Sequence, residues 1–159
     1  NRTLVRENAV NANWAPNGKR LVFQQPSDGS IRTTAVDGGK GSDTLVAVSG
    51  SEPAWSPNGS WIAYEFNGNI WKRRVNIHGT ASGAPIQITH LNGWLVGGPT
   101  WSADGKSIIF NAGVSEDIDL WSVPAAGGEI TWLTGAPVFG DYGPATSNNS
   151  TVAYASFSP

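Results

Sequence analysis

The feature that most constrains the fold of this chain is a short sequence unit that repeats in phase. Three clear copies read NANWAPNGKRLVF from Asn11, EPAWSPNGSWIAY from Glu52 and GPTWSADGKSIIF from Gly98. A shorter copy, GPATSNNSTVAY, starts at Gly143 and has lost the Trp and the Gly of its turn. A unit that recurs in this way sets the architecture of the whole chain rather than the shape of one loop.

The spacing of the copies identifies the class of repeat. The marker residues Trp14, Trp55, Trp101 and Thr146 are 41, 46 and 45 residues apart. A period in the low to middle forties, built from short β-like runs, is typical of propeller blades of four strands. Helical repeats need long segments with apolar residues three or four apart, and Gly or Pro interrupts this chain too often for that. We therefore predict an all-β fold, a β-propeller arc.

Each copy divides into strands. In the second copy we predict Pro53–Ser56, Trp61–Phe66, Ile70–Ile77 and Pro85–His90, with a tight turn at Pro57-Asn58-Gly59. In the third copy the later strands are predicted at Lys106–Asn111, Ile118–Val123 and Glu129–Thr134, and in the first at Arg20–Gln25, Ser30–Val36 and Asp43–Val48.

The ends of the chain predict partial blades. Thr3-Leu4-Val5 lies as far before Trp14 as Thr44-Leu45-Val46 lies before Trp55, so it reads as the last strand of an earlier blade. The predicted blade boundaries are 1–10 (that last strand), 11–48, 52–91, 98–135 and 143–159, the last being the start of a further blade with a strand at Val152–Phe157. We expect the natural chain to continue, the alternative being that several arcs assemble.

The repeat resembles that of the TolB-like β-propellers, a WD-like repeat with a Pro-Asp-Gly signature. The resemblance lies in W-S-P-N-G and W-S-A-D-G, each followed by an apolar strand and then by Asn69-Ile70-Trp71 or Asp119-Leu120-Trp121. It covers nearly the whole chain and implies blade architecture. Similar repeats occur in propellers attached to prolyl-oligopeptidase-type hydrolases, so the resemblance does not specify a function. Two copies carry Asn where the family usually has Asp.

The repeated aromatic residues are expected to be structural. Trp14, Trp55 and Trp101 should pack between adjacent blades, where a large flat ring covers much apolar area. Trp71 and Trp121 occupy matching third-strand positions and should pack within the blades as well. Two further tryptophans, Trp61 and Trp132, have no counterpart in the repeat and receive no assignment.

Composition and motifs exclude several classes of function. Formal charge is −2 and charged residues are 14%, too neutral a balance for a nucleic-acid surface or a polybasic membrane patch. There is no Cys, and no apolar run approaches the length of a membrane span. The sequence contains no nucleophile elbow and no zinc-protease motif. Neither His78 nor His90 has a legible catalytic partner, and Glu116 to Asp119 lack the spacing of a calcium loop. We expect no enzyme activity, no metal and no cofactor.

The candidate binding residues lie in loops. Loops between one blade's last strand and the next blade's first should share a face with the loops between second and third strands. The first set spans Ser49 to Glu52, Leu91 to Gly97 and Ala136 to Gly143. On this face we predict an aromatic platform and an acidic rim, formed by Trp94, Tyr142, Asp28, Glu52, Glu116, Asp117 and Asp141. The alternatives are that Trp94 folds back over the blade edge and that the rim is merely solvated.

Two functions from different classes follow. The first is a non-catalytic scaffold for protein interaction or assembly, periplasmic or extracellular, with a basic partner or with self-association through blade edges at residues 1–8 and 150–159. The second is the accessory propeller of a serine hydrolase whose catalytic domain lies outside this chain.

Overall fold

The computed structural model describes residues 7–37, 42–115, 117–134, 141–146 and 151–156. Within them the chain is all β. The strands are β1 (Val10–Trp14), β2 (Arg20–Gln25), β3 (Ser30–Ala35), β4 (Thr44–Ala47), β5 (Ser51–Trp55), β6 (Trp61–Phe66), β7 (Asn69–Val75), β8 (Ala81–Gln87), β9 (Leu95–Trp101), β10 (Ser107–Val114), β11 (Asp117–Pro124), β12 (Thr131–Trp132), β13 (Asp141–Thr146) and β14 (Val152–Ser156).

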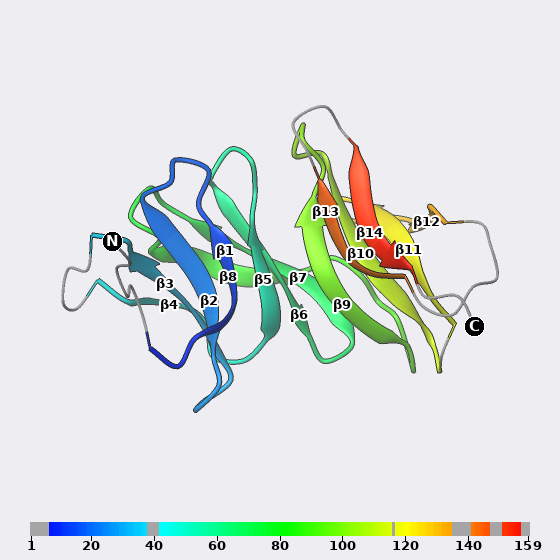
Figure 1. The fold of residues 1–159 in the computed structure, drawn as a ribbon, viewed down its shortest axis with the longest axis horizontal. Coiled ribbons are helices and arrows are strands. Elements are labelled where there is room, and N and C mark those ends of the chain that lie inside the picture. The colour runs from blue at the N-terminus through cyan, green and yellow to red at the C-terminus, as the bar shows by residue number, and fades with distance from the viewer. Residues whose placement is uncertain (1–6, 38–41, 116, 135–140, 147–150, 157–159) are drawn as a thin grey trace.

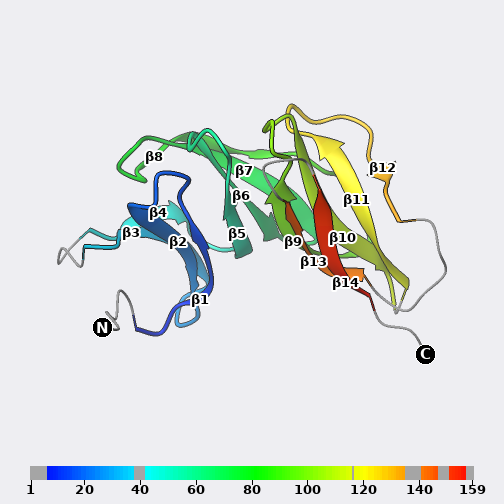
Figure 2. The ribbon, with the colours of Figure 1, turned by 45° about the horizontal axis from the view of Figure 1, so that its top comes forward.

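These strands form three antiparallel sheets of four strands and one of two. We call them blade 1 (β1-β2-β3-β4), blade 2 (β5-β6-β7-β8), blade 3 (β9-β10-β11-β12) and the partial blade (β13-β14). Each sheet is a meander, so strand order follows the chain. The sheets stand side by side in chain order, and the first strand of each lies on the inner side of the arc (Figures 1 and 2). The predicted β-propeller arc is confirmed.

In each of the first three repeat copies one Asn or Asp side chain accepts a backbone hydrogen bond within the turn. In blade 2 the Oδ1 atom of Asn58 accepts hydrogen bonds from the Ser56 hydroxyl and the Ser60 amide, at 2.8 and 3.0 Å. In blade 3 Oδ1 of Asp104 accepts hydrogen bonds from the Lys106 amide and the Ser102 hydroxyl. These bonds, led by that of the Lys106 amide, lower the pKa of Asp104. Asn and Asp both close this turn because each offers the accepting oxygen that it needs. The turns are backbone devices, as predicted.

A second repeated contact ties the fourth strand to the third. The Thr89 hydroxyl accepts from the Ile70 amide at 2.9 Å and donates to Oδ1 of Asn69 at 3.0 Å. In blade 3 Thr134 plays the same part towards the Leu120 amide and Asp119. The Asn-Ile-Trp and Asp-Leu-Trp runs therefore mark a polar clamp as well as a packing position.

The cores lie between blades. Trp55 and Trp101 are 7% and 4% exposed and belong to the clusters between blades 1 and 2 and between blades 2 and 3. Trp71 and Trp121 are half-buried against the same two clusters, as predicted. The prediction for Trp14 is wrong, because this side chain is 57% exposed. Trp14 occupies the repeat position, but no described blade precedes blade 1 to cover it.

Several strands begin earlier than predicted. The starts of β5 at Ser51, β9 at Leu95 and β13 at Asp141 lie in segments that we predicted as loops. The fourth strand of blade 2 also begins earlier, at Ala81 in place of Pro85. In blade 3 the fourth strand shortens to Thr131–Trp132. The early starts share a cause, because these strands contain bulges that break the alternation by which strands are recognised in sequence. The predicted strand at residues 3–5 falls outside the described residues.

Candidate functional site

The innermost strands of all four sheets carry a bulge at corresponding points. The register slips by one residue between Val10 and Asn13, between Ser51 and Ala54, and likewise in β9 and β13. In the first three blades a residue at the bulge has a positive φ: Asn11 at 52°, Glu52 at 50° and Gly98 at 54°. These three residues are the first of their repeat copies.

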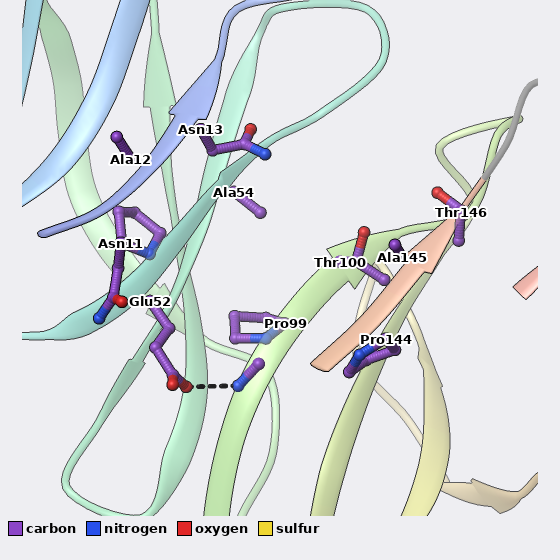
Figure 3. Close-up of a pocket in the computed structure, with 12 residues that line it drawn as sticks. Asn11, Ala12, Asn13, Glu52, Ala54, Pro99, Thr100, Pro144, Ala145 and Thr146 are labelled. Carbon is purple, nitrogen blue, oxygen red and sulfur yellow. Dashed lines mark hydrogen bonds between the residues drawn. The ribbon is translucent and has the colours of Figure 1, made fainter. Parts of the chain in front are cut away.

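The bulged segments line a concavity on the inner side of the arc. It has a volume of about 460 Å³ and is open to one side. Figure 3 shows the side chains converging on it from four strands. The lining residues are Asn11, Ala12, Asn13, Glu52, Pro53, Ala54, Gly98, Pro99, Thr100, Pro144, Ala145 and Thr146. Every sheet contributes three consecutive residues, so the repeat itself builds the site.

Glu52 is the only charged residue among those that line the concavity. Its Oε2 atom accepts a hydrogen bond from the Gly98 amide of the neighbouring blade at 2.5 Å. A Cβ atom at Gly97 would lie only 2.7 Å from Oε2, so the Gly97-Gly98 pair leaves the space that the carboxylate occupies. The carboxylate is thus held at the wall between blades 2 and 3.

Hydrogen bonds between blades fix the innermost strands relative to each other. The Trp55 amide donates to Oδ1 of Asn13 at 3.0 Å, and Nε1 of Trp101 donates to the Ala54 carbonyl at 3.1 Å. The Thr146 hydroxyl donates to the Trp101 carbonyl at 2.6 Å. The wall of the concavity is therefore a preformed surface, as binding sites usually are.

Hydrogen bonds join the two predicted sets of loops at one face of the arc. The Gly50 amide donates to the Gly29 carbonyl at 3.0 Å, which joins the β4–β5 and β2–β3 loops. In blade 2 the Asn69 side chain joins the β6–β7 turn to Leu91 in the β8–β9 loop. Both loop sets thus share one face, as expected. The innermost strands begin on that face. The residues that line the concavity start at the second residue of β1 and β5 and at the fourth residue of β9 and β13.

Trp94 lies in the β8–β9 loop and packs back onto blade 3. Its ring meets that of Trp121 edge-on at 5.3 Å, and Trp121 stacks with Trp132 at 6.4 Å between centroids. Trp94 is half-buried, so part of its surface stays available on the loop face. The geometry is the one expected if Trp94 folds back over the blade edge. A binding role for the exposed part stays a prediction.

The acidic candidates do not form one group. Asp28 in the β2–β3 turn accepts from the amide and hydroxyl of Ser30 and pairs with Arg32 at 3.2 Å. These bonds, led by that of the Ser30 hydroxyl, lower the pKa of Asp28. Asp28 is therefore engaged in its own turn, whereas Asp117 is exposed at the start of β11.

The remaining candidates fall wholly or partly outside the described residues. Glu116 is not described. Asp141 and Tyr142 belong to β13, where they pair with Ser156 and Ala155, and their side chains are not described. We predicted these two residues in a loop, but they begin a bulged strand.

Sequence reasoning missed most of the concavity. It singled out Glu52 but not Asn11, Asn13, Thr100 or Thr146. A signal was present, because all of these residues lie in the first four positions of the repeat copies. Only the curved arrangement of blades brings them to one surface.

The described residues offer no arrangement for catalysis or metal binding. His78 and His90 are exposed on different elements. No three His, Asp or Glu side chains gather in the described part as metal ligands would. That part also contains no helix long and apolar enough to span a membrane.

No family model matches this chain, and no curated protein matches it in sequence. Solved structures do match its fold. The crystal structure of TolB from Acinetobacter baumannii superposes with a TM-score of 0.72 at 17% identity, over 92% of this chain and 37% of that one. A nidogen/laminin complex matches with a TM-score of 0.72 at 14% identity, over 91% of this chain and 55% of that one.

An enzyme is also among the similar structures. A puromycin-hydrolyzing peptidase from Mycobacterium tuberculosis matches with a TM-score of 0.65 at 17% identity, over 92% of this chain and 27% of that one. The chain spans little more than a third of the TolB chain that it matches. At these identities the likeness shows the fold alone, which is that of a TolB-like β-propeller.

Proposed function

We propose that this chain is a non-catalytic scaffold that binds a protein partner through its loop face and the inner concavity beneath it. The observation that carries the proposal is the concavity itself, to which every sheet contributes three consecutive residues. A polar, preformed hollow beside a loop-bearing face is the kind of place where binding sites are found. Because the chain matches only part of the structures that it resembles, the activity of the whole protein is part of this proposal.

Two features of the face favour a protein over a small ligand. The residues that line the concavity include no aromatic side chain, whereas small-molecule sites are lined mainly by apolar and aromatic ones. Partly exposed aromatic and acidic side chains lie on the loop face, as in Trp94 and Asp117. Aromatic groups anchor protein interfaces and charged groups at the rim guide the approach of a partner. A periplasmic or extracellular setting belongs to the same proposal and is supported by the TolB-like fold.

The test is selection of ligands without assuming a partner. Short random peptides displayed on phage are selected on the immobilised chain, and bound peptides are located by hydrogen exchange. We expect protection in the β4–β5 and β8–β9 loops and at the residues of the innermost strands that line the concavity. Protection confined to the opposite face, or no enrichment, would contradict the proposal.

Variants sharpen this experiment. Replacing Trp94 and Tyr142 by Ala should weaken the selected binding without unfolding the chain. Ile77→Ser is the matched control, because Ile77 is 78% exposed in the β7–β8 link on the opposite face. Circular dichroism checks that each variant is folded. Equal binding by the double variant and by the control would remove those two residues from the site.

The second candidate is an accessory propeller that gates substrate for a serine hydrolase. The observation in its favour is the match to the puromycin-hydrolyzing peptidase, of which the chain spans 27%. Sequencing the gene on either side of these 159 codons separates the two candidates. An adjoining α/β-hydrolase domain would favour the accessory role, and further blades alone would favour the scaffold.

A further inference from the structure

We infer that Glu52 selects a cationic group of the partner, a lysine or arginine side chain, that enters the inner concavity from the loop face. The inference rests on the proposed function and names the chemistry that its site recognises.

The first support is the charge of the concavity. Glu52 carries the only charge among the lining residues. Only its Oε2 atom is engaged, by the Gly98 amide. Among the described residues, Oε1 receives no hydrogen bond and no Lys or Arg lies within ion-pair distance of the carboxylate. A carboxylate has acceptor sites for several donors, so Glu52 keeps unused acceptor sites at the wall of the concavity.

The second support is the chemistry of the other polar side chains that line the concavity with Glu52. The other polar side chains at the wall, such as Asn11 and Thr100, are neutral amides and hydroxyls that can accept hydrogen bonds. Nδ2 of Asn11 donates to Oε1 of Gln24, and within the described part of the chain the Asn11 Oδ1 atom receives no hydrogen bond. Ammonium and guanidinium groups donate several hydrogen bonds and accept none. One carboxylate among neutral acceptors matches a single cation, and would repel an anion.

The third support is backbone strain. Glu52 has a φ of 50° at the bulge where blades 1 and 3 use Asn11 and Gly98. Asn and Gly adopt this left-handed conformation at little cost, whereas it is energetically unfavourable for Glu. The backbone at this bulge therefore favours Asn or Gly, but blade 2 has Glu at the position. Strained residues that the fold does not require are concentrated at binding and active sites.

A purely structural role for Glu52 is the competing explanation. In it the carboxylate serves only to join blades 2 and 3 through Gly98. The Glu52→Gln variant separates the two roles, because a Gln amide oxygen still accepts from the Gly98 amide but carries no charge.

The experiment is an NMR titration of the ¹⁵N-labelled chain with two matched probes. Nα-acetyl-lysine N-methylamide carries the cation, and Nα-acetyl-norleucine N-methylamide has the same stem without it. We expect the lysine probe to bind in the millimolar range and to shift the amide signals of the non-proline lining residues, which are Asn11, Ala12, Asn13, Glu52, Ala54, Gly98, Thr100, Ala145 and Thr146. Binding should weaken with added salt and be about 3–5-fold weaker for the norleucine probe. Equal binding of both probes, or no shifts with the lysine probe, would overturn the inference.

Two variants complete the test. Glu52→Gln should lose about 3–5-fold in affinity for the lysine probe while its melting temperature stays near that of the wild type. Glu52→Asn should lose the affinity and melt about 2–4 °C higher, because Asn relieves the strained φ. Unchanged affinity in Glu52→Gln would mean that Glu52 is a structural residue. A lower melting temperature in Glu52→Asn would mean that the bond to the Gly98 amide outweighs the strained φ, which would remove the third support.

The failure of this inference can be told from failure of the proposed function. The selected peptides could bind the loop face without enrichment in Lys or Arg, and could bind Glu52→Gln as well as the wild type. That result would support the scaffold function and contradict the role of Glu52 in binding a cation. Peptides that bind only elsewhere on the chain would contradict the proposed scaffold function. The titration with the lysine probe would still test whether Glu52 binds a cation.

Discussion

At the residue scale, the contacts between blades depend on a few backbone positions that tolerate no side chain. Gly79, in the β7–β8 link, inserts its carbonyl between the hydroxyls of Thr33 and Thr44 of blade 1, at 3.1 and 2.9 Å. A Cβ atom there would lie 2.2 Å from Oγ1 of Thr33. A different residue serves the same purpose one blade later, where Nζ of Lys72 donates to the Ala125 carbonyl at 2.6 Å.

Gly79→Ala should therefore destabilise the chain by about 2–4 kcal/mol, since it adds a steric clash to a left-handed φ of 71°. Gly83→Ala is the matched control. Gly83 has a φ of 68° but no atom within 4 Å of the added Cβ, so only about 1 kcal/mol should be lost. Urea unfolding measures both. Equal losses would show that backbone conformation alone, and not the docking at Thr33, requires glycine.

At the scale of the element, the clamp between third and fourth strands is the contact that the repeat reproduces most closely after its turn. Thr89 is 2% exposed and serves both the Ile70 amide and the Asn69 side chain. Thr134 makes the same two contacts in blade 3, but it is less buried and its bond to Asp119 is longer, at 3.3 Å. The same motif should thus contribute different amounts of stability in the two blades.

Thr89→Val should cost about 1–3 kcal/mol, because it leaves a buried amide and a buried side-chain oxygen without a partner. Thr134→Val should cost less, about 1 kcal/mol, because Thr134 and its partner Asp119 are only half-buried and water can replace part of the lost bonding. Denaturation midpoints with unchanged m-values would report these losses. A larger loss for Thr134→Val would mean that the clamp in blade 3 is tighter than its geometry indicates.

At the scale of the whole molecule, the blades depend on each other for their cores. The hydrophobic clusters take residues from adjacent sheets, and the repeated tryptophan fills the gap between them. Trp101 is 4% exposed and bonded to the Ala54 carbonyl of blade 2, whereas Trp14 is 57% exposed. The same repeat position therefore has two environments, depending on whether a preceding blade covers it.

Trp101→Ala should cost about 3–5 kcal/mol, because it removes a large buried side chain and leaves a cavity between blades. Trp14→Ala should change stability by less than about 1 kcal/mol in the chain as it stands. Thermal unfolding followed by circular dichroism measures both. A large loss for Trp14→Ala in dilute solution would show that another blade, from this or a second chain, covers it.

The sequence by itself determined the blade. The W-x-P-N-G and W-x-A-D-G turns, the alternation in Trp61–Phe66 and the period in the forties are local patterns, and local patterns encode turns, strands and hairpin pairing. The second strands of the first two blades were predicted at their observed bounds for this reason.

Only the tertiary structure decided what the repeats do together. Bulges hid the early starts of β5 and β9, because an extra residue breaks the alternation that marks a strand. The burial of Trp101 and the exposure of Trp14 depend on a neighbouring sheet rather than on the residues beside them. The concavity around Glu52 joins positions more than forty residues apart, and no periodicity states how far each blade is turned against the next. That angle follows from packing between blades. The repeat therefore predicted the individual blades, whereas the concavity forms only when the blades pack into an arc.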